Sequence, residues 1–389
     1  MKRTKLHKNV YLLGFVSLFT DLSSQMVYPL VPQFLTSLGA SSTIIGLVEG
    51  IAESTASLFK AVFGKLSDRF GKRKLFVFMG YGLSALSKPF LFLATLWPHV
   101  LVVKFSDRVG KAVRNPARDA LISTSVPSDI RATAFGWHRA MDRVGAIGGP
   151  LLAMLILAFI DEDVRWVFLL SAIPALMALI FIPFAHESEE MFKATATRRD
   201  SWEKGRHEYK IFLIVMIIFT LGNSSNAFLI LKALESDFSI VTIPVLWMVY
   251  NVVCTISSPI LGKYADKVGK KHVIYLSFLY YTLIYSVFAF VYEQWMIWLL
   301  FAAYGIYYGL SAGVYKAYIA DLVPPNNRAG AYGIFETGIG LALFPASLIM
   351  GLIWDSFGSQ WAFLTSAGFS FLAVLVLMLS SLRNKTSFG

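Results

Sequence analysis

Long apolar stretches recur along the whole chain and limit what it can fold into. Each stretch is roughly 20 to 25 residues long, and a helix needs about 20 residues to cross the hydrocarbon layer of a bilayer. Lipid offers the backbone no hydrogen-bond partners, so such a stretch must be helical. The sequence therefore predicts an all-α membrane protein with twelve transmembrane helices, at residues 11–38, 42–64, 75–96, 99–124, 131–157, 164–185, 210–232, 240–262, 273–292, 295–321, 328–353 and 359–382.

The composition excludes a soluble fold of this length. Of the 389 residues, 56% are hydrophobic and 15% are charged, whereas soluble domains carry about 25% charged residues. One globular core could not bury this much apolar surface. A polar segment interrupts the apolar pattern near the middle of the chain. It predicts a six-helix bundle at 1–185, a cytoplasmic linker at 186–209 and a second six-helix bundle at 210–389.

The basic residues predict the orientation of the chain in the membrane. Of 35 Lys and Arg residues, 23 fall on the side of the N-terminus, three of them at the first residue of a predicted helix (Arg131, Lys210 and Arg328). One, Arg165, falls on the opposite side at the edge of a predicted helix, and 11 fall deeper within the predicted helices. Basic loops stay in the cytoplasm, so we expect a multi-pass protein of the plasma (inner) membrane with both termini cytoplasmic. The net charge of +11 then reflects topology, and no nucleic-acid partner is expected.

Residue patterns that carry catalysis or bind cofactors are missing from the sequence. The single cysteine, Cys254, excludes disulfides and cysteine-based metal sites. There is no nucleotide-binding Gly-x-x-x-x-Gly-Lys-Ser/Thr loop, and no arrangement of a nucleophile with a base stands out. We therefore expect no enzyme activity, no cofactor and no metal. The first apolar run is too long for a signal peptide and is assigned as the first helix.

Two loops repeat one pattern at equivalent places in the two halves. Residues 64–74 read Gly-Lys-Leu-Ser-Asp-Arg-Phe-Gly-Lys-Arg-Lys, and residues 262–272 read Gly-Lys-Tyr-Ala-Asp-Lys-Val-Gly-Lys-Lys-His. Residues 119–136 and 316–333 correspond in the same way, with a proline, an arginine and a glycine at equivalent offsets. Two six-helix halves related by such repeats are a known transporter architecture.

The repeated loop resembles the G-x-x-x-D-x-x-G-K-R-K signature of the major facilitator superfamily, and the resemblance covers essentially the whole chain. Arg108-Val109-Gly110 resembles the family's arginine motif, and residues 145–150 resemble, in degenerate form, the glycine-proline stretch of its antiporters. The resemblance implies the major facilitator fold, with two pseudo-symmetric six-helix bundles and a substrate site near the midplane between them. It also implies a gating role for Gly64, Asp68, Arg69, Gly71, Arg73, Gly262, Asp266 and Gly269.

The signature also has a physical interpretation. Its glycines allow a tight turn between two helices, and its basic residues hold the loop against the anionic inner leaflet. Asp68 is expected to accept hydrogen bonds from a helix N-terminus or from an arginine, and so to close the cytoplasmic side in one state. The alternative is a solvated basic turn that only sets topology.

The fourth predicted helix carries an exceptional set of charges. Lys104, Asp107, Arg108, Lys111, Arg114, Arg118 and Asp119 fall within it, on an arc of about 140°. A charge near the bilayer centre costs about 3 kcal/mol or more, so such residues usually face a cavity and have a function. The excess of cations favours an anionic or zwitterionic substrate, since arginine suits carboxylates and phosphates. Pairing with acids on adjacent helices is the alternative.

Further polar residues extend this candidate substrate site onto other helices. The first helix contributes polar residues near its middle, the fifth a basic one, and the second half amides, tyrosines and a lysine, although ordinary helix packing is the more common role of such a tyrosine. The substrate-binding candidates are Gln25, Tyr28, Arg108, Lys111, Arg114, Arg139, Asn223, Asn226, Asn251, Tyr308 and Lys316.

The driving force should be an ion gradient, because no nucleotide-binding loop is present. A carboxylate buried in the membrane beside a cation is suited to proton exchange. The candidates for proton coupling are Asp21, Glu53, Asp142 and Glu336, and for each a structural ion pair is the alternative role. We favour exchange of a proton for substrate at Asp21, which lies on a helix expected to face the basic fourth helix.

The leading function is a secondary transporter that exports a small organic, anionic or amphipathic solute in exchange for protons, such as a drug, a metabolite or a siderophore. Proton-coupled uptake of an organic anion fits the basic residues equally well. A non-transporting membrane receptor is a third interpretation, which the short tails outside the predicted helices disfavour. The expected partners are the solute, protons and the lipid bilayer, and the chain is expected to act as a monomer.

Overall fold

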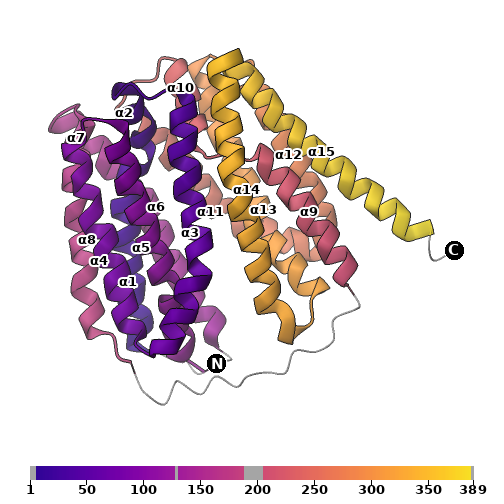
Figure 1. Cartoon of the computed structure of the whole chain (residues 1–389), viewed down its shortest axis with the longest axis horizontal. Coiled ribbons are helices and arrows are strands. Elements are labelled where there is room, and N and C mark those ends of the chain that lie inside the picture. Colours follow the sequence, from indigo (N-terminus) through magenta and orange to yellow (C-terminus); the bar gives the residue numbers. More distant parts are fainter. Residues whose placement is uncertain (1–5, 128–129, 188–204, 387–389) are drawn as a thin grey trace. The chain divides into compact units, whose positions relative to one another are not determined.

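A computed structural model describes residues 6–127, 130–187 and 205–386 (Figure 1). Within these ranges the chain forms helices and no strand, and each of the twelve predicted ranges overlaps one helical span. The spans are α1–η1–α2 (Lys8–Val27, Tyr28–Leu30, Val31–Ser37), α3 (Ser42–Phe70), α4–η2 (Arg73–Ser87, Lys88–Leu93), α5 (Trp97–Thr124), α6 (Arg131–Phe159), α7–α8–η4 (Val164–Leu170, Ala172–Phe181, Ile182–Phe184), α9–α10 (Arg206–Gly222, Ala227–Glu235), α11 (Ile243–Val268), α12 (Lys270–Phe288), α13 (Gln294–Leu322), α14 (Arg328–Phe357, after η6 at Pro325–Asn327) and α15 (Ser359–Thr386).

The spans differ in how apolar they are. Within the described ranges, nine are long and apolar enough to cross a membrane by themselves, and α3, α5 and α12 are not among these nine. The case of α5 is the clearest, because its 28 residues include the seven charges predicted for the fourth helix. Such charges require protein or water around them rather than lipid. The polar helices therefore depend on their neighbours for a favourable environment.

The contacts between Cα atoms divide the chain into two compact units. The first comprises Met1–Gly39, Thr55–Thr195 and Ser239–Met248, and the second comprises Ala40–Ser54, Ala196–Phe238 and Val249–Gly389. Helices α3 and α11 contribute to both. The division at 1–185, 186–209 and 210–389 expected from the sequence stays a prediction, since residues 188–204 of that linker lie outside the described ranges.

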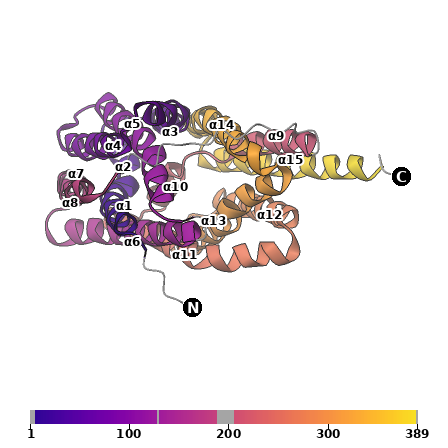
Figure 2. The same cartoon turned by 90° about the horizontal axis from the view of Figure 1, so that it is seen from below.

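In the first unit, α1 packs against α6 and α8, and α4 packs against α5. Figure 2 shows these helices grouped around one another. Glycines permit the closest approaches: a Cβ added to Gly149 of α6 would lie 2.5 Å from the carbonyl oxygen of Leu22 in α1, and one added to Gly80 of α4 would lie 2.6 Å from the carbonyl oxygen of Gly110 in α5. A side chain at either glycine would push the helices apart.

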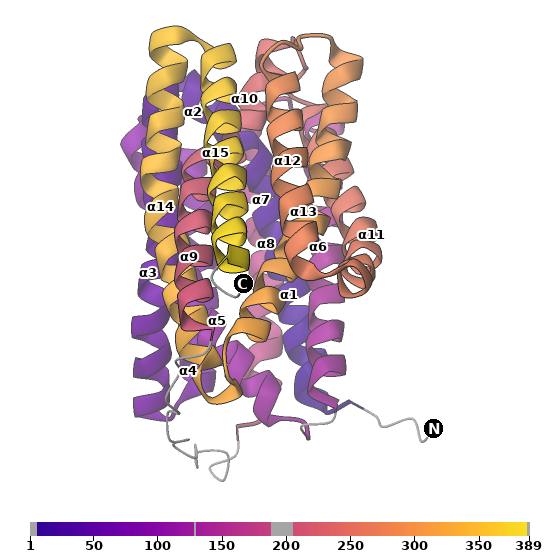
Figure 3. The ribbon, with the colours of Figure 1, turned by 90° about the vertical axis from the view of Figure 1, so that its right-hand side faces the viewer.

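In the second unit, α15 packs against α9 and α12, and α9 also packs against α14 (Figure 3). Its core is aromatic. The rings of Phe219 and Phe278 stack with centroids 4.3 Å apart, and those of Tyr281 and Tyr285 stack at 4.0 Å. Stacked aromatic pairs add stability beyond the area that they bury. The core of this unit is thus built from ring packing, whereas the interior of the first unit carries most of the charges.

The outward faces of the helices are apolar. Ile173, Leu176 and Ile180 of α8 are exposed at intervals of three and four residues, and Leu276 and Leu283 of α12 are exposed as well. This spacing places side chains on one face of a helix. In water such faces would be unfavourable, but they suit direct contact with lipid chains. The pattern agrees with a protein that lies within a bilayer.

Candidate functional site

Close helix packing brings the charges of α5 into the interior of the first unit. Lys104 and Arg114 are buried, whereas Val102 and Phe105 of the same helix are exposed. The remaining charges of α5 are half-buried. The close contact between Gly80 and Gly110 described above leaves no room for side chains between α4 and α5 at that level. Arg114 and Arg118 of α5 lie against polar groups of α4.

Arg114 is held by residues of α4 and not by an acid. Its guanidinium donates to the Ser84 hydroxyl and lies over the ring of Tyr81, 4.6 Å from the centroid. The neighbouring Arg118 is different, because it pairs with Asp119 at 2.9 Å and also donates to the Tyr81 hydroxyl at 3.4 Å. Within the described ranges no carboxylate lies within ion-pair distance of Arg114. Its charge is thus stabilised by a hydroxyl and an aromatic ring.

Lys88 is a second buried cation of this kind, and the sequence analysis did not identify it. It stands where α4 gives way to η2, and its side chain is 4% exposed. The ammonium donates to the hydroxyls of Ser23, at 3.1 Å, and Ser24, at 2.7 Å, both on α1. Its signal in the sequence was a lone lysine before Pro89 inside an apolar range. One charge in an otherwise apolar span is easy to overlook.

Two of the predicted coupling carboxylates lie in the same unit. Asp142 of α6 accepts a hydrogen bond from the Ser17 hydroxyl of α1 and lies 3.4 Å from Nδ1 of His138. Asp21 lies on α1, half-buried, one helical turn beyond Ser17. Among the described residues Asp21 makes no hydrogen bond or ion pair. It is the carboxylate of this group that remains open to a proton or to a mobile cation.

Aromatic residues border the site toward the end of α1. Gln25 accepts a hydrogen bond from the indole of Trp247 at 2.7 Å, and the Trp247 ring lies 4.9 Å from that of Tyr28. The ammonium of Lys104 is 5.8 Å from the centre of the Tyr28 ring, within the range of a cation–π contact. Trp247 was not expected here, because an apolar residue at the start of a predicted helix carries no functional signal by itself.

The other predicted residues of this region are spread more widely. Arg108 lies 3.7 Å from the neighbouring Asp107, Lys111 is half-buried, and Arg139 of α6 is exposed. Glu53 of α3 is half-buried and belongs to the second unit. The structure thus gathers Asp21, Gln25, Tyr28, Arg108, Lys111, Arg114 and Asp142 in the first unit.

The seventh span is interrupted in its middle, whereas the sequence analysis predicted one continuous helix at 210–232. Helix α9 ends at Gly222 and α10 begins at Ala227. Side chains satisfy backbone groups at the break: the hydroxyl of Tyr281 donates to the Gly222 carbonyl at 2.9 Å, and the Ser225 amide donates to the Ser347 hydroxyl at 3.1 Å. The physical reason is the run of Asn and Ser at 223–226, whose side chains compete for backbone hydrogen bonds.

The predicted amides of the second half lie at or near this break. Asn223 and Asn226 occupy the break itself, where Asn226 accepts a hydrogen bond from the Tyr304 hydroxyl at 2.7 Å. The Ser225 hydroxyl donates to the buried carboxylate of Glu49 at 3.2 Å. Asn251 of α11 is buried. Broken helices with free polar backbone are typical of binding regions in transporters.

The remaining predicted residues lie on α13 and α14. The Lys316 ammonium pairs with the Glu336 carboxylate at 2.9 Å, and both side chains are partly exposed. Tyr308 is exposed, and its ring packs edge-on against that of Tyr250 with centroids 6.0 Å apart. The pair of Lys316 and Glu336 joins a predicted substrate ligand to a predicted coupling acid.

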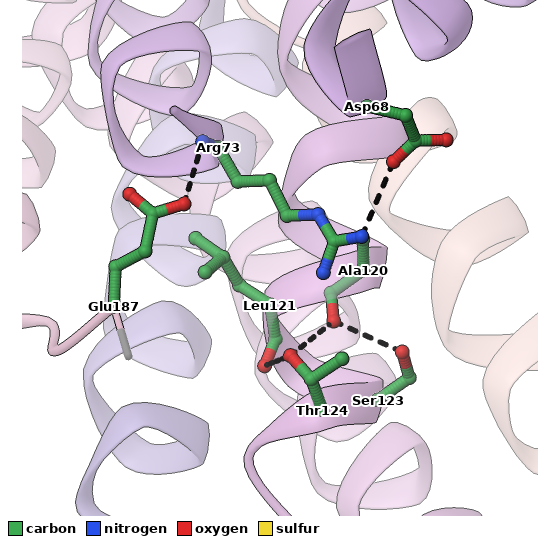
Figure 4. A network of polar contacts seen from close by, with 7 residues as sticks. All are labelled: Asp68, Arg73, Ala120, Leu121, Ser123, Thr124 and Glu187. Atoms are coloured by element: carbon green, nitrogen blue, oxygen red, sulfur yellow. Dashed lines mark hydrogen bonds and ion pairs between the residues drawn. The ribbon is translucent and has the colours of Figure 1, made fainter. Parts of the chain in front are cut away.

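The first signature loop, between α3 and α4, forms a compact polar network (Figure 4). Arg73 donates to Asp68 at 3.2 Å, an arginine partner of the kind expected for this aspartate. The carboxylate of Glu187, which follows η4, accepts hydrogen bonds from the backbone amides of Arg73, at 2.6 Å, and Lys74, at 3.1 Å. Anions are favourable at a helix N-terminus, so Glu187 caps α4.

The glycines of the two signature loops have different roles. Gly71 and Gly269 have positive φ angles of 67° and 98° and form the turns. Gly64 and Gly262 lie inside α3 and α11, which continue to Phe70 and Val268, beyond the predicted ends. The expectation that all of these glycines form the turn was therefore wrong for the first glycine of each loop. Arg69 and Asp266 are exposed.

Comparison with known proteins agrees with this architecture. A family model described as Major Facilitator Superfamily matches residues 13–211 and 211–387. An uncharacterised MFS-type transporter of Methanocaldococcus jannaschii is 36% identical over 380 residues, which are 96% of this chain and 95% of that protein. The multi-drug resistance efflux pump PmrA of Streptococcus pneumoniae is 23% identical over 293 residues, 71% of this chain and 72% of that protein. A crystal structure of the nucleoside transporter NupG has a TM-score of 0.80 at 15% identity, covering 96% of this chain and 99% of that one.

Proposed function

Since this chain belongs to the Major Facilitator Superfamily, as a multi-pass membrane transporter with twelve membrane helices, we propose that it exports small organic anions or amphipathic solutes in exchange for protons. Alternating access would carry the solute across the plasma membrane, with both chain termini in the cytoplasm and the chain acting as a monomer. The solute class, the direction and the proton are the parts of this proposal that require experiment.

The observation that carries the proposal is a pair of buried cations without acidic partners. Within the described ranges, neither Arg114 nor Lys88 has a carboxylate at ion-pair distance, and serine hydroxyls hold both. An uncompensated buried charge is unfavourable, so the site gains from an incoming anion. A guanidinium offers paired donors that match a carboxylate or phosphate.

The acids of the first unit support proton coupling. Asp21 lies half-buried on α1 without a hydrogen bond among the described residues, and Asp142 lies on the adjoining α6. A carboxylate that lies beside cations in a membrane interior is suited to binding and releasing a proton during transport. We therefore assign the exchanged proton to Asp21, with Asp142 as the second acid of the group. Glu53 and Glu336 are less favoured, because neither lies in this unit.

Export is favoured over uptake by two observations. The pneumococcal relative is named as an efflux pump, and the glycines at 145 and 149 that bring α6 against α1 belong to the stretch that resembles the antiporter motif. Proton-coupled uptake of an organic anion is the second candidate, because buried cations serve either direction. A receptor without transport activity is the third.

The test uses inside-out membrane vesicles with an acidic lumen, read by a pH-sensitive dye. Citrate, salicylate, a catecholate siderophore and tetraphenylphosphonium are added in turn to vesicles that contain wild-type protein, Asp21→Asn or the control Asp163→Asn. Asp163 is an exposed carboxylate that caps α7, and asparagine is an equally good cap.

We expect an anion of this panel to release protons from wild-type and Asp163→Asn vesicles and not from Asp21→Asn vesicles. Proton release by tetraphenylphosphonium alone would contradict the anionic solute class. Release that persists in Asp21→Asn would remove Asp21 from the coupling step. If no compound releases protons and radiolabelled citrate accumulates in right-side-out vesicles under a proton gradient, export is wrong and uptake takes its place.

A further inference from the structure

Lys88, at the start of η2, contacts two serines of α1. Its ammonium binds the Ser24 hydroxyl at 2.7 Å and the Ser23 hydroxyl at 3.1 Å. Ser24 follows Asp21 by three residues, so the two lie on the same side of α1. The rise of an α-helix puts these positions about 4.5 Å apart along the axis. The buried lysine thus binds one helical turn from the carboxylate to which we assign the exchanged proton.

The present contacts of Lys88 do not neutralise its charge. The side chain is 4% exposed, and within the part of the chain that the structure describes its ammonium has only hydroxyl partners. An ammonium removed from water is costly without an anion nearby. Lysine also has a flexible four-carbon stem that allows its charge to move between partners. These properties favour a second position for the ammonium beside a carboxylate.

Two carboxylates, those of Asp21 and Asp107, act electrostatically on the Lys88 ammonium. Asp21 lies on α1, and Asp107 lies on α5, where its carboxylate is already 3.7 Å from the Arg108 guanidinium. Asp107 acts on the Lys88 ammonium more strongly than Asp21 does, but it already has Arg108 as a neighbour. Asp21 makes no hydrogen bond or ion pair among the described residues. The charged groups that act most strongly on Lys88 are, in decreasing order, Asp107, Arg114, Asp21 and Arg108. Those that act most strongly on Asp21 are Asp142 on α6 and then Lys111, Arg114 and Arg118 on α5.

We propose that Lys88 is the internal counter-ion of Asp21: its ammonium pairs with Asp21 when that carboxylate has lost its proton and rests on Ser23 and Ser24 when Asp21 carries the proton. The proton leaves to water and returns from water, and Lys88 keeps its charge throughout. The structure then corresponds to the state with Asp21 protonated. The inference rests on the proposed function, because it gives Asp21 the exchanged proton, and it makes Lys88 a positioning residue for that step.

The test is a double-mutant cycle that needs no substrate. The chain has nine tryptophans, so their intrinsic fluorescence reports unfolding of the purified protein during heating at either pH. Wild type, Asp21→Asn, Lys88→Met and the double variant are compared at pH 7.5 and pH 5.0. Non-additive losses measure the interaction between two residues.

At pH 7.5 we expect the double variant to lose less than the two single losses together, by about 3 °C or more in unfolding temperature. At pH 5.0 the losses should add to within about 1 °C, because a protonated Asp21 no longer attracts the ammonium. Additive losses at both pH values would overturn the proposal. Equal non-additivity at both would also overturn it, since it would indicate a permanent contact.

Two control cycles test whether the coupling is specific to the pair of Lys88 and Asp21. Lys232 is a fully buried lysine of the second unit, 3.6 Å from Glu235, so Lys232→Met combined with Asp21→Asn should be additive at both pH values. Lys88→Met combined with Asp107→Asn examines the competing acid, and a larger pH-dependent coupling there than with Asp21 would refute the assignment. If Lys88→Met does not fold, Lys88→Gln takes its place, because its amide still donates to the serines.

The double-mutant cycle tests the role of Lys88, and the vesicle assay tests proton exchange, so the two claims can be refuted independently. Proton release from vesicles without coupling in the cycle would refute the role of Lys88 and leave the proposed function intact. Coupling in the cycle without proton release by any compound would refute proton exchange while the charge pair stands. Proton release that is retained in Lys88→Met vesicles at the wild-type rate would show that Lys88 is not needed for the step.

Discussion

Replacing Gly149 by alanine tests the close packing of α1 against α6. A Cβ at this position would lie 2.5 Å from the Leu22 carbonyl oxygen, 2.8 Å from the Cβ of Gln25 and 2.9 Å from the Met26 amide nitrogen. Non-bonded atoms are normally about 3.5 Å apart, so the helices must separate locally by about 1 Å. Two of the three obstructing atoms are backbone and cannot turn aside.

Overpacking of this kind costs about 1 to 3 kcal/mol. For a large domain each kcal/mol lowers the unfolding temperature by about 2 to 4 °C, so Gly149→Ala should lower it by roughly 2 to 12 °C. The assay is the reaction of Cys254 with a thiol dye during heating, since Cys254 lies in α11 and is far in sequence from the substitution. Exchange of protons for solute should fall as well, because Gln25 lies at the same contact.

The matched control is Gly136→Ala in the same helix. A Cβ at Gly136 meets nothing within 4 Å, and alanine in a helix is favoured over glycine by about 1 kcal/mol, so this variant should be unchanged or slightly more stable. If Gly149→Ala were as stable as Gly136→Ala, the close contact between α1 and α6 would not exist as described, and the argument from helix packing would be refuted.

Three further predictions concern polar contacts at helix ends. Glu187→Ala removes the acceptor for two amides at the start of α4, which should cost about 1 to 2 kcal/mol and speed amide hydrogen exchange there, as mass spectrometry would detect; unchanged exchange would contradict the cap. Asn9→Leu removes two hydrogen bonds to the backbone of His186, at 2.7 and 2.8 Å. Limited proteolysis should then cut the segment after η4 faster than in the wild type, and an unchanged cleavage rate would contradict this. Asp355→Ala frees the first two amides of α3, now held at 2.9 and 2.8 Å, and should lower the unfolding temperature by about 2 to 4 °C, whereas Asp355→Asn should lose less.

The fold was predictable because its signals are long and repeated. Apolar ranges, the asymmetry of basic residues and the duplicated loop each act over many residues, and together they indicated twelve helices before any coordinates. The interruption between Gly222 and Ala227 was missed, because four polar residues lower the mean hydropathy of a 20-residue range only slightly. The Asn and Ser residues there prefer to bond to the backbone, which in retrospect indicated a break.

The site was harder to predict, because its contacts join residues that are far apart in sequence. The charges of α5 were identifiable, since charged residues in a membrane helix are rare. That no carboxylate of the described residues lies at ion-pair distance from Arg114 or Lys88 could not be inferred, because either alternative, pairing or an open anion site, was compatible with the sequence. Lys88 and Trp247 were missed altogether, since each stands in an otherwise apolar range. Their roles depend on contacts with a helix far away in sequence: Lys88 binds Ser23 and Ser24, and Trp247 binds Gln25.

The charge density of α5 has a consequence for how the chain enters the membrane during synthesis. Its central charges include Arg108, Lys111 and Arg114, and each costs about 2.5 to 3.5 kcal/mol when a helix moves alone from the translocon into lipid. The apolar residues of one helix cannot offset so large a total. Because the hydroxyl and the ring that hold Arg114 lie on α4, the two helices should leave the translocon together. A ribosome-bound chain that stops before α5 is complete should therefore still hold α4 at the insertion channel.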